Sequence, residues 1–451
     1  MDAAASCVPF FGSTSFNRGP YLAAGPTGDV AAMVGCYGQG ASSTPVVVAR
    51  VNGSGQGVSN SNFTSSSNHV YPAYVDIGPG NHLGVAWAAF PGIGDRGVTV
   101  TGNAYFSTYD TAIFSGEQVD ALGNLYVLAQ AQGSTPVTLD ASITLPANAS
   151  AAMPVTWLVR EGPSGPKVYG GPPSTYLADG QAGVFYFSAL SGTLNLGCGP
   201  MVPTSPSSSY LARLDPLGAC LYADVLPMSP SILADGQGGV LLYVPNATAP
   251  LDLGCGTKSV VPGGSTVFAR LDGAGACVFG GSFGATGLGF RFGPGGAVVV
   301  SGSVGATAVD LGTGPLAPIG SQDLVVASLD PLGNVLGARR FGAPGLSLGG
   351  SVTESAKGDV YIKTSYAGVV DFGGGPVTAA SGDVVMASLS PSCGHRWSRA
   401  LHLTGQYLAD VDGCGGLVVV SADTAFNPGG GTFIPANASF NQYLGFARFQ
   451  P

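Results

Sequence analysis

A segment of two short strands joined by a tight turn recurs along this chain and constrains its fold more than any other feature. One type of segment reads YLARLDPLGACLYADVL at 210–226 and VFARLDGAGACVFGGSFG at 267–284. A second type alternates with it, as in TYLADGQAGVFYFSAL at 175–190 and SILADGQGGVLLYV at 231–244. Together the two types make a unit of four strands, with a first turn, a long connection and a last turn between successive strands. Self-similarity at a fixed period is typical of repeat architectures.

The first apolar residue after each first turn marks one unit. Eight markers are found, at Val30, Val85, Leu125, Val184, Val240, Val298, Val360 and Leu417. Their spacings are 55, 40, 59, 56, 58, 62 and 57 residues. This period predicts an all-β chain that forms one β-propeller of eight four-stranded blades over residues 1–451. A β-helix would have a shorter repeat, and a sandwich would have no reason to repeat its sequence. Seven blades remain the alternative, because the unit at Val85 is the weakest.

The composition agrees with a compact all-β protein. Apolar residues make up 45% of the chain and charged residues 9%, while 73 glycines and 33 prolines separate short runs rich in Val, Leu and Ala. No apolar run approaches the roughly 18 residues of a membrane-spanning helix, so no transmembrane segment is expected. A net charge of -9 leaves no basic surface for nucleic acid. The first residues lack the basic and apolar regions of a secretion signal.

The repeat resembles that of a known bacterial family. The segments FARLDGAG, ADGQGGV and VDFGGG are similar to the repeats of bacterial β-propeller proteins often labelled seven-bladed and frequent in myxobacteria. The resemblance covers nearly the whole chain and is strongest over 175–401. It implies an exported repeat protein, and the family has no single assigned activity. The chain departs from the family by its cysteines and by keeping the usual Trp of the last strand only at Trp397, where other units have Val8, Leu221, Val278 and Leu336.

The two ends of the chain complement each other. The C-terminal segment QYLGFARFQP at 442–451 stops where other units enter their last turn. The N-terminal segment SCVPFFG at 6–12 aligns with ACVFGGSFG, a fourth strand. We therefore expect residues 6–12 to complete the last blade, pair with the C-terminal strand and remove two exposed sheet edges.

The eight cysteines follow the repeat and contain no C-x-x-C motif. Cys198 and Cys255 share one place in the unit, and Cys220 and Cys277 share another place 22 residues later. The next two units lack both cysteines, with Thr313 and Gly374 at the first place and Val335 and Arg396 at the second. This joint presence predicts the disulfides Cys198–Cys220 and Cys255–Cys277, with four buried thiols as the alternative. Turns on one face of adjacent blades suggest Cys393–Cys414, and elimination leaves Cys7–Cys36. Such bonds indicate an oxidising compartment: the periplasm, the cell surface or the exterior.

A polar residue also recurs in the long connections, which we expect on the face where propellers place their pockets. Its copies are Asp140, Asn195, Asp252, Asp310 and Asp371. They are candidates for contacts with a ligand or a calcium ion, although repetition in every unit argues against catalysis. The first turns carry Asp120, Asp179, Asp235 and Asp412, which hairpin-turn chemistry explains.

No catalytic constellation, metal site or cofactor other than calcium is indicated, because the four histidines have no ligand spacing. We expect an exported, non-catalytic binding or structural module of a cell surface or extracellular assembly. Its expected partner is a protein, a glycan or further copies of the chain. The alternative is a secreted hydrolase or lyase acting on glycans through channel carboxylates such as Asp95, Glu117 or Glu354, and two carboxylates in one pocket would favour it.

Overall fold

A computed structural model describes residues 175–355 and 358–401 without a gap, strands between 21 and 169 with a few adjoining turn residues, and three strands between 407 and 449. Apart from Ala31, side chains are described between Gln118 and Leu401. The predicted closing strand at 6–12 lies outside the described residues, as do Cys7, Cys36, Asp140 and Cys414.

The described chain is all-β, as predicted, and is built from antiparallel sheets that follow one another in sequence. Within the described residues there are seven four-stranded sheets and one three-stranded sheet, and no α-helix. We number these sheets 1 to 8 in chain order. Each four-stranded sheet consists of one predicted unit.

The strand bounds of sheets 1 to 4 are as follows. Sheet 1 holds β1 (Tyr21–Ala24), β2 (Val30–Gly35), β3 (Val46–Val51) and β4 (Gly57–Phe63). Sheet 2 holds β5 (His69–Ile77), β6 (Leu83–Phe90), β7 (Arg96–Val100) and β8 (Asn103–Ser107). Sheet 3 holds β9 (Ala112–Val119), β10 (Leu125–Ala131), β13 (Val155–Glu161) and β14 (Lys167–Tyr169). Sheet 4 holds β15 (Thr175–Ala178), β16 (Val184–Ala189), β19 (Ser209–Leu214) and β20 (Cys220–Leu226).

The remaining sheets continue this order. Sheet 5 holds β21 (Ser231–Ala234), β22 (Val240–Ala247), β23 (Ser265–Leu271) and β24 (Cys277–Phe283). Sheet 6 holds β25 (Gly289–Phe292), β26 (Val298–Val304), β29 (Asp323–Leu329) and β30 (Val335–Phe341), with a 3-10 turn at Pro294–Gly296. Sheet 7 holds β31 (Gly350–Glu354), β32 (Val360–Thr364), β35 (Val384–Leu389) and β36 (His395–Leu401). Sheet 8 holds β37 (Tyr407–Val411), β38 (Leu417–Asp423) and β39 (Tyr443–Phe449).

Four of the long connections carry a small hairpin of their own. The hairpins are β11–β12 (Val137–Thr138, Thr144–Leu145), β17–β18 (Leu194–Asn195, Pro200–Met201), β27–β28 (Val309–Asp310, Pro315–Leu316) and β33–β34 (Gly368–Asp371, Pro376–Ala379).

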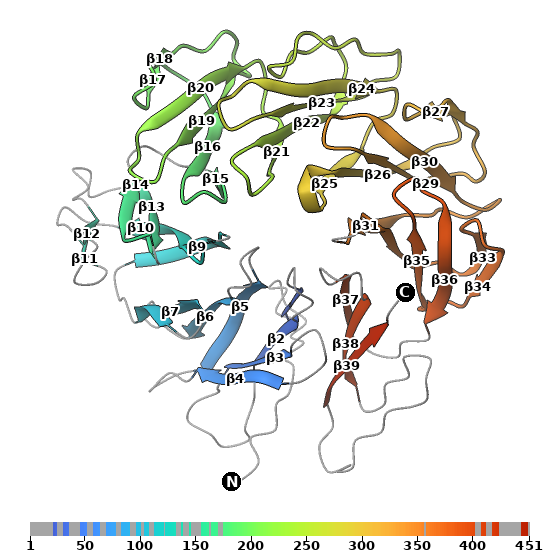
Figure 1. Cartoon of the computed structure of the whole chain (residues 1–451), viewed down its shortest axis with the longest axis horizontal. Coiled ribbons are helices and arrows are strands. Elements are labelled where there is room, and N and C mark those ends of the chain that lie inside the picture. Colours follow the sequence, from blue (N-terminus) through green and yellow to red (C-terminus); the bar gives the residue numbers. More distant parts are fainter. Residues whose placement is uncertain are drawn as a thin grey trace.

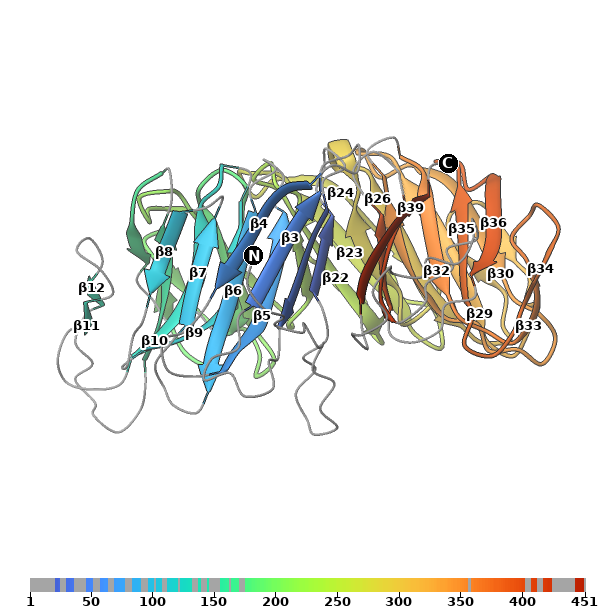
Figure 2. The ribbon, with the colours of Figure 1, turned by 90° about the horizontal axis from the view of Figure 1, so that it is seen from below.

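The sheets lie around a central opening in sequence order (Figure 1). First strands such as β15, β21, β25 and β31 face the opening, and fourth strands such as β20, β24, β30 and β36 lie outside (Figure 1). Seen from the side, the sheets stand next to one another at one level (Figure 2). No helix of the described residues has the length and apolar character needed to cross a membrane.

The core lies between neighbouring sheets, which explains why the middle strands are apolar without alternation. Val298, Val299 and Val300 of β26 are all buried, because each face of sheet 6 is covered by a neighbour. One buried cluster joins Phe185 of sheet 4 to Leu242 of sheet 5. The sheets are therefore held together by burial of apolar side chains on both faces.

Candidate functional site

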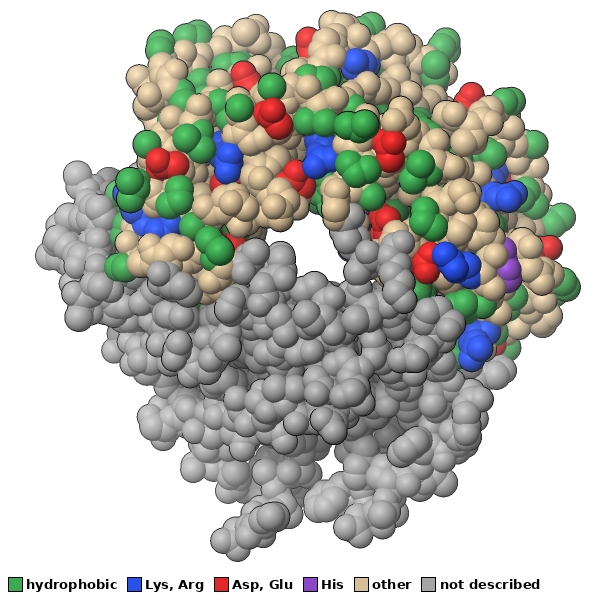
Figure 3. Space-filling model, viewed as in Figure 1, with side chains coloured by type: hydrophobic (Ala, Val, Ile, Leu, Met, Phe, Trp, Pro, Cys, Tyr) green, Lys and Arg blue, Asp and Glu red, His purple; other side chains and the backbone are tan. Residues whose placement is uncertain are grey.

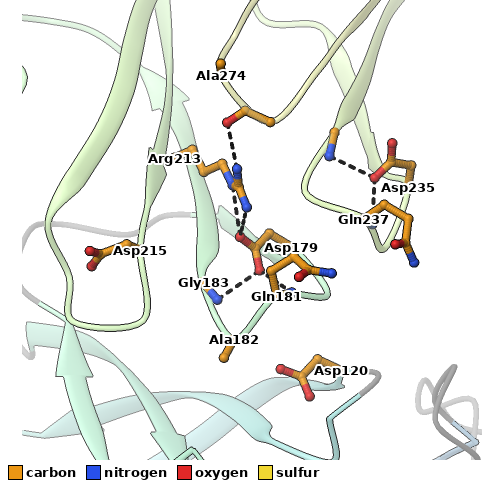
Figure 4. A network of polar contacts seen from close by, with 12 residues as sticks. Asp120, Asp179, Gln181, Ala182, Gly183, Arg213, Asp215, Asp235, Gln237 and Ala274 are labelled. Atoms are coloured by element: carbon orange, nitrogen blue, oxygen red, sulfur yellow. Dashed lines mark hydrogen bonds and ion pairs between the residues drawn. The ribbon is translucent and has the colours of Figure 1, made fainter.

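An arginine on the third strand bridges neighbouring sheets and pairs with the aspartate of the first turn in sheets 4 and 5. In sheet 4, the Arg213 Nε and Nη2 groups donate to Asp179 Oδ2 at 2.9 and 2.7 Å (Figure 4). Its Nη1 donates to the carbonyl of Gly273, in the last turn of sheet 5, at 2.6 Å. Asp179 Oδ1 accepts the backbone N–H groups of Gln181 and Gly183. We call this contact the arginine bridge.

The arginine bridge recurs with the repeat. Arg270 donates to Asp235 of its own sheet at 3.0 Å, and to the carbonyls of Gly296 and Pro331 in sheet 6 at 3.0 and 2.9 Å. Arg160 of sheet 3 donates to the Ala182 carbonyl of sheet 4. On the face in Figure 3, acidic and basic side chains accordingly lie near one another around the opening. The hairpin-turn role expected of these aspartates agrees with their backbone contacts, while Asp412 lies outside the described residues.

The repeated polar residues of the long connections do not come together. Asn195, Asp310 and Asp371 lie on the small hairpins of sheets 4, 6 and 7, and Asp252 follows an isolated bridge between Leu251 and Lys258. The hairpins of sheets 4 and 7 pack against the outer, fourth strand, β18 on β20 and β34 on β36. Their oxygens accept backbone N–H groups of their own turn: Asn195 from Gly197, Asp252 from Gly254, Asp310 from Gly312 and Asp371 from Gly373. No three His, Cys, Asp or Glu side chains of the described residues lie close enough to hold a metal ion. Turn formation therefore accounts for the recurrence of these four residues.

Two disulfides fasten the long connections of sheets 4 and 5 to the outer strands. Cys198 is bonded to Cys220 and Cys255 to Cys277, with Cα–Cα distances of 5.5 and 5.1 Å. These are the two pairs that the repeat predicts. The strand register pairs Leu214 with Cys220 and Leu389 with His395. His395, rather than Arg396, therefore occupies the second cysteine place in sheet 7, and its ring lies against Gly374, where a larger residue would collide.

Removing one disulfide gives a measurable loss of stability. Replacing Cys255 and Cys277 together with alanine should lower the free energy of unfolding by about 3 kcal/mol, because the bond closes a loop with 22 residues of separation. Urea denaturation measures this loss. A reducing agent should then destabilise the variant less than the wild type, and equal sensitivity of the two proteins would contradict the assignment.

The expected pair of Cys393 and Cys414 is wrong, because Cys393 is a free, buried thiol. The last turn of sheet 7 packs onto the preceding sheet, where Arg339 Nε donates to the Cys393 carbonyl at 3.3 Å. The thiol lies next to the backbone of Ser328 in sheet 6. Burial raises its pKa to about 11.

A pocket of about 360 Å³ opens between sheets 5 and 6, at the end of the strands opposite the first and last turns. Its walls are 261–264 before β23, 284–286 after β24, and 303–305 and 307–309 from the end of β26 to the start of β27. None of the described lining residues carries a charged side chain, and hydroxyl groups come from Thr286, Ser303 and Thr307. The pocket lies at the long-connection end, where the repeat predicts ligand contacts, but none of the predicted residues Asn195, Asp252, Asp310 and Asp371 lines it.

Hydrogen bonds from residues outside the pocket fix the position of its walls. Arg340 donates to the carbonyls of Gly305 and Thr307 at 2.6 and 2.7 Å, and is itself fixed by Asp323 at 2.6 Å. Thr266 Oγ1 donates to the Ala285 carbonyl at 2.8 Å. The pocket is therefore formed before any ligand arrives, which lowers the entropy cost of binding.

A departure from the repeat leaves this space open. In sheet 4, the hydroxyls of Ser205 and Ser207 bond the Pro227 carbonyl and tie the equivalent turn to the chain leading into sheet 5. Sheet 5 has glycines at this turn, and Gly263 and Gly264 have φ values of +95° and +98° that favour glycine. The signal in the sequence is the change from TSPSS at 204–208 to VPGGS at 261–265.

One of the three expected channel carboxylates has an unusual environment. Burial, and secondarily the charge of Asp359, raise the pKa of Glu354 to about 7. Asp359 is ion-paired, with its Oδ1 2.7 Å from Arg396 Nη2. Glu117 lies in β9, where its side chain is not described, and Asp95 lies outside the described residues.

Comparisons with known proteins add no assignment. No family model matches this chain, and no curated protein sequence matches it.

Proposed function

We propose that residues 1–451 form one eight-bladed β-propeller of the bacterial repeat type, closed by residues 6–12. The order of the sheets around the opening supports the proposal. The described part of sheet 8 has three strands where the other seven sheets have four, and β39 is the third of them. A fourth strand from 6–12 would complete it and cover its edge.

We further propose that this ring is an exported binding module and that the pocket between sheets 5 and 6 takes an uncharged group of a glycan. The observation that carries the proposal is a preformed pocket beside the turn of sheet 5, where Pro262 and Gly264 take the places of the bridging serines Ser205 and Ser207 of sheet 4. Its lining offers hydroxyl and backbone groups without a charged side chain, which suits sugar hydroxyls. Two disulfides support export.

A substitution that fills the pocket with a large side chain tests this function. Gly305 faces open space and has no left-handed φ, so Gly305→Trp should fill the pocket without backbone strain. Gly192→Trp is a matched control, because Gly192 is equally open in the corresponding connection of sheet 4. On an array of neutral oligosaccharides, wild type and G192W should bind the same members, and G305W should bind them at least about tenfold more weakly. Binding of none, or equal binding by G305W, would contradict the proposal.

The hydrolase alternative rests on Glu354, whose pKa of about 7 suits a general acid. The partner carboxylate nearest in sequence, Asp359, is held by Arg396. The same oligosaccharides should therefore remain uncleaved after long incubation. Cleavage that Glu354→Gln abolishes would establish the alternative instead.

A further inference from the structure

The arginine bridge is missing between sheets 6 and 7. The third strand of sheet 6 has Ser328 where sheets 4 and 5 have Arg213 and Arg270, and its first turn has Gly293 where they have Asp179 and Asp235. Both partners of the bridge are thus replaced together. We call the contact between these two sheets the seam.

Groups of sheet 7 occupy the seam in place of the bridge. The Glu354 carboxyl lies so close to Gly293 that a side chain at position 293 would collide with it. The thiol of Cys393 lies next to the backbone of Ser328. The Ser328 side chain is fully buried, and its Oγ has no hydrogen-bond partner among the described residues. The seam therefore lacks the third-strand arginine and its counter-charge, and it is closed by packing together with the hydrogen bond from Arg339 to the Cys393 carbonyl.

Ionisation of the Glu354 carboxyl is unfavourable in this position. Its Oε2 is shielded from solvent and has no hydrogen-bond partner among the described residues. A carboxylate buried without a cation or a donor is costly, whereas the neutral acid packs with little penalty. The first turn of sheet 6, at 293–297, has no charged residue that could compensate it.

The charged groups described around the seam have partners other than Glu354. Asp359 repels a charge on Glu354 and pairs with Arg396. Arg339 donates to the Cys393 carbonyl, and Arg270 to Asp235 and to carbonyls of sheet 6. Lys357 lies outside the described residues. The described surroundings thus favour the protonated carboxyl.

We propose that the seam is a pH-sensitive joint of the ring, closed while Glu354 is protonated and loosened when it ionises. Glu354 has a higher pKa in the folded chain, about 7, than its ordinary value of 4.5. The closed seam then holds more protons than the open one between these values, so its stability falls as pH rises from about 4.5 to 7 and is level above that. The joint is independent of any ligand in the pocket between sheets 5 and 6.

Cys393 is a built-in probe of the seam, because its buried thiol reacts only when the seam opens. The native protein is treated at pH 5 to 8 with 4,4′-dithiodipyridine, an uncharged reagent that reacts in weak acid, and labelling is read by mass spectrometry on the peptide that contains Cys393. The rate for wild type is divided by the rate for Glu354→Gln at each pH, which cancels the ionisation of the thiol. Gln mimics the neutral acid, so E354Q should keep the seam closed.

The ratio of the two rates should rise about tenfold or more between pH 5 and 7 and then level off. The wild-type melting temperature should fall over the same interval while that of E354Q does not. Asp252→Asn, which removes an exposed carboxylate in the long connection of sheet 5, should behave as wild type. A ratio independent of pH would overturn the proposal, and so would a melting temperature with the same pH dependence in wild type and E354Q.

Discussion

Replacing Asp179 with alanine should lower the free energy of unfolding by about 3 to 5 kcal/mol. Asp179 is fully buried and accepts two backbone N–H groups and two donors of Arg213. Without it, Arg213 keeps its contact with Gly273 but remains a largely buried cation without a counter-charge. Chemical denaturation of the full chain measures the loss.

Asp215 provides the matched control for this substitution. Its Oδ1 accepts the N–H groups of Leu217 and Ala219 in the same turn geometry, but no described arginine contacts it and the contacts are exposed. Asp215→Ala should therefore cost only about 1 kcal/mol. Equal losses in D179A and D215A would show that the turn, and not the arginine bridge, stabilises the contact between sheets.

Deleting residues 1–12 should lower the melting temperature by about 10 °C or more. The proposed closing strand would supply the fourth strand of sheet 8, and the fourth strands of sheets 4 to 7 each end in a buried residue, namely Leu226, Phe283, Phe341 and Leu401. Its loss would expose the edge of β39 and open the ring at one contact. Differential scanning calorimetry measures the shift.

A shorter deletion separates closure from a general effect of truncation. Removing residues 1–5 takes away the chain before the proposed strand and should leave the melting temperature unchanged. If both truncated proteins melt together at the wild-type temperature, residues 6–12 do not close the ring.

The repeat predicts the scaffold well because the same contacts are needed in each unit. The marker residues Val184, Val240, Val298 and Val360 each begin a second strand. The two cysteine places are both filled in some units and both empty in others. This joint occurrence predicts the Cys198–Cys220 bond, because a bond requires both residues. The aspartates of the turns recur for a similar reason, because each carboxylate accepts hydrogen bonds from backbone N–H groups that follow it in the sequence.

Features that depend on contacts between units were not predicted. The position of Asn195 in the sequence does not reveal that its hairpin folds back against β20, and the turn position of Cys393 does not reveal that its thiol faces sheet 6. The pocket lies beside a turn that lacks the bridging hydroxyls of sheet 4, because Pro262 and Gly264 take the places of Ser205 and Ser207. The seam arises from Ser328, where an arginine is absent. The sequence changes behind the pocket and the seam are visible as departures from the repeat. Their structural effect, however, depends on the residues of the neighbouring unit.

Hydrogen–deuterium exchange tests the central claim, that the glycine-lined gap between sheets 5 and 6 is the ligand site. With an oligosaccharide that the array selects, exchange should slow in 261–264, 284–286, 303–305 and 307–309, and G305W should show no such protection. Protection confined to the first and last turns or to the small hairpins, or protection that persists in G305W, would contradict the account.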